Sequence, residues 1–121
     1  MVWDPARITP RPWPGVIEFY RRIEDRNAEF RPMRLLAEHV ASQPYAGSIF
    51  GATSGTALLV TAHAGADWMK HGVRIDLDLV GTICFVLQEH RGARPHVILR
   101  SETDNVVASF EGFLRKARWL S

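Results

Sequence analysis

The sequence is poor in cysteine, with a single residue of this type, Cys84, among 121 residues. One thiol excludes an internal disulfide, and it also excludes a zinc site built from the cysteines of one chain. Cys84 lies in the apolar run TICFVLQ, where a buried, unreactive thiol is the usual case. Because a chain without disulfides suits a reducing compartment, we expect a cytoplasmic protein.

The sequence also lacks the patterns of a signal peptide and of a membrane span. Its first fourteen residues contain four prolines and two tryptophans, not a basic segment followed by an apolar one. The uncharged run of residues 44–66 is long enough to cross a membrane, but five glycines or prolines interrupt it. This composition favours strands and turns, and we expect no membrane partner.

An excess of charge of one sign is missing as well. Fifteen lysines and arginines against thirteen aspartates and glutamates give a net charge of +2. The basic residues alternate with acids, as in YRRIEDRNAEFR, whereas a nucleic-acid-binding protein presents a one-sided basic patch. We therefore do not expect nucleic acid as a partner.

What the sequence does have is the composition of one globular domain. It is 46% hydrophobic and 23% charged, and its length suits a single hydrophobic core. We predict one α+β domain over residues 1–121, whose first part, residues 1–14, is an extended arm rich in proline and tryptophan.

Apolar residues at helical spacing predict two helices before the sheet and one packed on the sheet after it. The first covers residues 14–27, and the second begins near Pro32 and ends before Pro44. The C-terminal helix begins with Asp104 as its N-cap. His39, in the second helix, is expected to be a surface or boundary residue.

From Gly47 onward the apolar residues recur with a period of two, which predicts a five-stranded, mostly antiparallel meander. The first hairpin joins residues 48–53 to 56–63 through a turn at Ser54 and Gly55, and it has apolar residues on both faces. Residues 73–90 form either a second hairpin or one bulged strand, and usual strand lengths favour the hairpin. The fifth strand covers residues 96–100.

The glycine-rich segment GATSGT, residues 51–56, has the look of a phosphate-binding loop. It lacks the lysine of that motif, and the residues after it continue as a strand where a helix is needed. It also lacks the first glycine of the motif that exposes a nucleophilic serine. A hairpin turn is therefore the prediction for this segment.

The loop of residues 63–71 is the main candidate for a site. Its residues His63, Asp67 and His71 are four apart, so one helical turn would bring them to one face, as a divalent metal or acid–base chemistry requires. No other cofactor is predicted. Trp68, in the same loop, is either an anchor for a partner or a seal over the core.

The meander topology gathers further polar residues at the same end of the sheet. This predicted rim consists of His63, Asp67, Trp68, His71, Glu89, His90, Arg91, Arg94 and His96. Because five strands at about 4.8 Å spacing extend over about 20 Å, membership of the rim does not by itself assemble a site.

The lack of a catalytic signature favours a non-enzymatic protein-binding or accessory module, acting through a sheet face or the rim. The alternative is a small metal-dependent or acid–base enzyme that uses the loop of residues 63–71. Weaker alternatives are a toxin-neutralising protein of the immunity type and a nucleic-acid adaptor. An uncovered apolar sheet face predicts a protein interface, formed with a second copy in a homodimer or with another protein.

Overall fold

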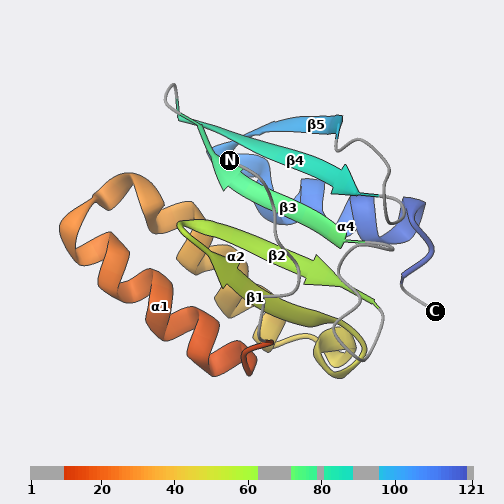
Figure 1. Cartoon of the computed structure of the whole chain (residues 1–121), viewed down its shortest axis with the longest axis horizontal. Helices are drawn as coiled ribbons and strands as arrows, with labels where there is room; N and C mark the ends of the chain where they lie inside the picture. The colour runs from red at the N-terminus through yellow and green to blue at the C-terminus, as the bar shows by residue number, and fades with distance from the viewer. Residues whose placement is uncertain (1–9, 63–71, 79–80, 89–95, 120–121) are drawn as a thin grey trace.

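The computed structural model describes residues 10–62, 72–78, 81–88 and 96–119 (Figure 1). Within these ranges the chain forms, in order, helices α1 (Trp13–Arg26) and α2 (Arg31–Ala41), strands β1 (Phe50–Ser54), β2 (Ala57–Thr61), β3 (Gly72–Leu77), β4 (Thr82–Gln88) and β5 (His96–Glu102), and helix α4 (Val106–Lys116). Short 3-10 turns precede α2, β1 and α4: η2 (Ala28–Phe30), η3 (Pro44–Gly47) and η4 (Thr103–Asn105). None of the described helices is long and apolar enough to cross a membrane.

Each strand of the sheet pairs antiparallel with the next, in the order β1-β2-β3-β4-β5. The predicted α+β fold with a five-stranded meander is therefore confirmed. The pairing of β3 with β4 also shows that these residues form a hairpin and not one bulged strand. In its loop the backbone N–H of Asp78 donates to the carbonyl of Thr82 at 2.8 Å, and Gly81 adopts a φ of +82°, which favours glycine.

The turn of the first hairpin lies one residue later than predicted. Ser54 pairs with Ala57, so Gly55 and Thr56 form the turn. The reason is conformational: the first turn residue has a φ of +60°, which glycine adopts readily and serine does not. Moving the turn by one residue shifts every cross-strand pair by two positions, so each side chain keeps its predicted face.

The three described α-helices cover one face of the sheet and form the core with it (Figure 1). Alternate strand residues supply the sheet side of this core: Leu58, Val60, Val73, Ile75, Ile83 and Phe85. The helix side comes mainly from Val16, Tyr20, Met33, Leu36, Val40, Phe110 and Leu114. These helix positions follow the 3.6-residue period, so a stripe of each helix is removed from water.

The side chain of Arg34 joins α2 to α1 by an ion pair. The Arg34 guanidinium, in α2, binds the carboxylate of Glu24 in α1 and that of Glu38 one turn further along α2. Arg34 and Glu38 do not belong to the buried apolar stripe of α2. Arg34 is only 18% exposed, because the neighbouring helix α1 lies over it.

The C-terminal helix begins later than its predicted N-cap. Asp104 lies inside the 3-10 turn η4, and α4 starts at Val106 after Asn105, whose side chain makes no capping hydrogen bond. Strand β5 continues to Glu102, so the chain needs this turn to reverse direction before the helix can start. Asp104 is therefore not the cap.

The described end of the N-terminal arm is fixed by Trp13. Its side chain is buried, its Nε1 donates to the carbonyl of Ile49 at 3.4 Å, and its ring packs on Gly51. Just before it, the backbone N–H of Arg11 donates to the carbonyl of Gly51 at 2.8 Å. The arm therefore covers part of the outer edge of β1, the first edge strand of the sheet.

The contact between Trp13 and Gly51 gives a stability prediction. A Cβ added at Gly51 would lie 2.8 Å from the indole ring, so we expect Gly51→Ala to lower the free energy of unfolding by about 1–3 kcal/mol. Gly47→Ala is the matched control, because nothing lies within 4 Å of its added Cβ. Urea unfolding measures both, and equal losses in the two variants would contradict the steric explanation.

Candidate functional site

The predicted rim lies largely outside the described residues. His63, Asp67, Trp68, His71, Glu89, His90, Arg91 and Arg94 all fall in the two segments that the structure does not describe, residues 63–71 and 89–95. His96 begins β5 and pairs with Leu87 of β4. The divalent-metal site predicted at His63, Asp67 and His71 therefore remains a prediction, and the described part of the chain contains no group of three metal-ligating side chains.

The strand ends next to these two segments do lie at one end of the sheet. Thr61 pairs with Gly72, and Gly72 pairs in turn with Gln88. On the far side of β4, His96 pairs with Leu87. Since these pairs form consecutive steps across the sheet, both segments leave the sheet at the same end.

A cluster of polar side chains that was not predicted joins three elements on the helix side. The Oε2 atom of Glu111, in α4, lies 2.8 Å from Nε2 of His39 in α2 and accepts a hydrogen bond from the Tyr45 hydroxyl at 2.9 Å. His39 is 29% exposed, which agrees with a boundary position. Its partner Glu111 is 72 residues away in the sequence, and no local pattern pairs them.

The protonation behaviour of this cluster favours a structural role. The hydrogen bond from His39, followed by that from Tyr45, lowers the pKa of Glu111, so its carboxylate stays charged. Burial, followed by the hydrogen bond to Glu111, raises the pKa of the Tyr45 phenol. Neither group is poised to exchange a proton near neutral pH, and the cluster instead ties α4 to α2 and η3.

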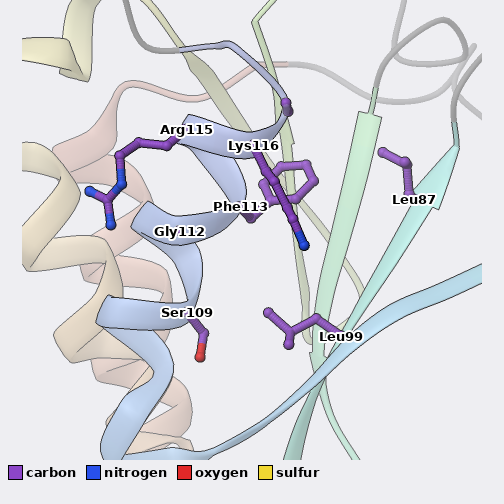
Figure 2. A pocket seen from close by; sticks show the side chains of 8 residues that line it. Leu87, Leu99, Ser109, Gly112, Phe113, Arg115 and Lys116 are labelled. Carbon is purple, nitrogen blue, oxygen red and sulfur yellow. The ribbon is translucent and has the colours of Figure 1, made fainter.

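The described residues form a groove between α4 and the β4–β5 end of the sheet (Figure 2). Its volume is about 920 Å³. The sheet contributes Leu87 and Leu99, and α4 contributes Ser109, Gly112, Phe113, Arg115, Lys116 and Ala117. The floor is thus apolar, and most of the polar lining comes from the helix.

Charge is distributed unevenly around the groove. Figure 2 shows the Lys116 side chain lying along the groove, whereas Arg115 points away from Leu99. Lys116 belongs to the last turn of α4, whereas the exposed acids Glu102 and Asp104 precede the first turn and are not among the residues that line the groove. Helix α4 therefore has a basic C-terminal end, and acidic residues precede its N-terminal end.

Gly112 is the most informative residue of the groove wall. It lies in the middle of α4, where glycine costs about 0.5–1 kcal/mol relative to alanine. An added Cβ would meet nothing within 4 Å, so no packing among the described residues requires glycine here. This mid-helix glycine was a signal in the sequence that the periodicity of apolar residues did not reveal.

The opposite face of the sheet is partly polar. The thiol of Cys84 lies 3.4 Å from Nη1 of Arg100 and 3.7 Å from Oδ2 of Asp78. It is half-buried, not fully buried as the sequence predicted, because position 84 points away from the helices. Next to this patch the same face is apolar: Ala52 and Leu59 are fully buried, with Phe50 packed against them.

Comparison of the chain with protein-family models, curated proteins and solved structures gives no match. Function is therefore argued from the groove, the polar cluster and the sheet faces of this chain alone.

The Glu111 cluster predicts an acid-sensitive contribution to stability. The folded-state pKa of Glu111 is lowered, so its contribution to the free energy of unfolding is complete above the ordinary pKa of 4.5. This contribution is lost as the pH falls through the lower pKa of the folded state. We expect Glu111→Gln to destabilise the protein by about 1 kcal/mol at neutral pH, and this difference to shrink in acid. Urea unfolding at several pH values measures it, with the exposed Glu102→Gln as control for loss of one charge. A difference that is constant with pH would contradict the prediction.

The environment of Cys84 predicts a slow thiol. Burial raises its pKa, and the nearby carboxylate of Asp78 raises it further against the opposing charge of Arg100. Less thiolate is then present at a given pH, so we expect iodoacetamide to alkylate Cys84 at least several-fold more slowly than it alkylates glutathione at pH about 8. Mass spectrometry follows the reaction, and unfolding in urea should abolish the difference. Alkylation of the folded protein at the glutathione rate would show that the thiol is not protected.

Proposed function

We propose that this protein is a non-enzymatic, cytoplasmic protein-interaction module that works by burying the groove between α4 and the β4–β5 end of the sheet. The observation that carries the proposal is the apolar floor of this groove, formed by Leu87, Leu99 and Phe113. Leu87 and Leu99 are half-buried and continue the apolar sheet face past the helices that the structure describes. Uncovered apolar surface of this kind is typical of protein interfaces.

The lining of the groove suits a protein better than a small ligand. Small-molecule sites enclose most of their ligand and place several polar groups around it. Here the Ser109 hydroxyl is already engaged with Ser101 at 2.8 Å, and Arg115 points away from the floor. Among the described lining residues, Lys116 is the charged one whose side chain lies along the groove (Figure 2).

The positions of the titratable groups support a non-enzymatic role. The cluster of His39, Tyr45 and Glu111 holds groups of the kind that acid–base catalysis uses. Glu111 does not line the groove, although the next two residues of α4, Gly112 and Phe113, do. An active site needs reactive groups and a substrate pocket together, and among the described residues this cluster and the groove are separate. A metal-dependent enzyme using His63, Asp67 and His71 remains the alternative hypothesis.

Site-specific photo-crosslinking tests the proposal. Benzoylphenylalanine in place of Gly112 puts a reactive group into the open space of the groove wall, and the same residue in place of the exposed Ala28, in η2, is the control. We expect irradiation of cells to give protein adducts from position 112 and few from position 28. Equal yields from both positions, or no protein adduct from position 112, would contradict a protein interface at the groove.

A further inference from the structure

We infer that the partner in the groove is a second copy of this chain, docked about a two-fold axis so that the two α4 helices run antiparallel. The inference rests on the proposed function and adds the identity of the partner. Each copy then covers the apolar floor of the other, and the contact is self-complementary, as a two-fold interface requires.

The charges at the two ends of α4 favour this arrangement. Lys116 lies at the C-terminal end of α4, and the exposed Glu102 and Asp104 lie just before its N-terminal end. An antiparallel pair of α4 helices brings the basic end of each copy to the acidic end of the other. A parallel pair would place like charges together, which is destabilising.

The position of Gly112 fits the same arrangement. It is the seventh of the eleven residues of α4, close to the middle, where two antiparallel helices related by a two-fold axis approach each other. The missing side chain leaves open space on the groove side. With Ser109 one turn earlier on the same wall, it allows a close approach of the two helices.

The irregular edge strand β5 favours a dimer contact between helices over one between strands. Among the described strands β5 is the last of the sheet, so its outer edge faces no further strand. Its pairing with β4 is interrupted by a bulge opposite Phe85 and Val86. A bulge twists an edge strand away from regular pairing with another chain. The groove and α4 are thus the better surface for a second copy.

Oligomeric state under matched substitutions tests the inference. We expect analytical ultracentrifugation of the purified chain to show a dimer at micromolar concentration. Gly112→Arg fills the groove and should raise the dissociation constant at least tenfold, whereas Ala28→Arg, at an exposed position of η2, should leave it within about twofold. Circular dichroism establishes that each variant is folded, and Gly112→Ala provides a smaller change in case the arginine variant is not.

Charge reversal tests the antiparallel orientation. Lys116→Glu alone and Asp104→Lys alone should each weaken the dimer several-fold, because each places like charges at the junction of the two ends. The double variant should restore most of the affinity.

The outcomes separate this inference from the proposed function. A monomer throughout the micromolar range, with crosslinks from position 112 to another protein, would overturn the dimer and leave the interaction module standing. A monomer without crosslinks would overturn both. A dimer that is indifferent to Gly112→Arg and to both charge reversals would place the dimer contact elsewhere and overturn the inference. A dimer that is lost with Gly112→Arg and regained by the double reversal supports both.

Discussion

The packing of three helices on alternate residues of the sheet is the constraint on which the rest of the structure depends. Leu58, Ile75 and Phe85 lie at neighbouring ladder positions and all face the helices. Since strand side chains alternate, their sequence neighbours Leu59, Arg74 and Cys84 must face the other way. A register slip of one residue would exchange the two sets and bury the charge of Arg74 in the core. The hydrophobic face therefore fixes the register, and the register fixes where every polar side chain of the sheet can lie.

The groove follows from where the helix layer ends. Helix α1 contacts α2 and β1, on the side of the first edge strand, and α4 contacts α2 and β5 (Figure 1). No described helix lies beyond α4. The alternation of apolar residues along the strands nevertheless continues to Leu87 and Leu99. The floor of the groove is therefore apolar even where no described helix covers the sheet. On the other flank of α4, Glu111 binds His39 and Tyr45 and holds this helix to the layer, which keeps the groove wall in place.

Local patterns in the sequence predicted the fold well, and they predicted contacts between distant elements poorly. Alternation along the strands and the helical stripes were sufficient for the meander and for the faces of Leu58 and Leu59, because each depends only on neighbouring residues. The turn at Gly55 was misplaced by one residue, since a single φ value distinguishes the two turns. The pairing of His39 with Glu111 joins α2 to α4, and the groove depends on the lateral extent of a whole layer. Neither property can be predicted from a short stretch of sequence. The predicted rim at residues 63–71 and 89–95 lies outside the described residues, so the structure does not test it.

Gly51 and Gly112 differ in whether packing among the described residues offsets the conformational cost of glycine. At Gly51 the space of the missing side chain is occupied by the ring of Trp13, so the conformational cost of glycine is offset by packing within the molecule. At Gly112 the same space is empty, although the position is helical and alanine would be favoured by about 0.5–1 kcal/mol. Domains of this size are stable by only about 5–15 kcal/mol, so such a cost is a noticeable fraction. No packing contact of the described residues at this position offsets the cost. A helix from a second copy, approaching closely along the wall that carries Ser109 and Gly112, would supply the missing contact.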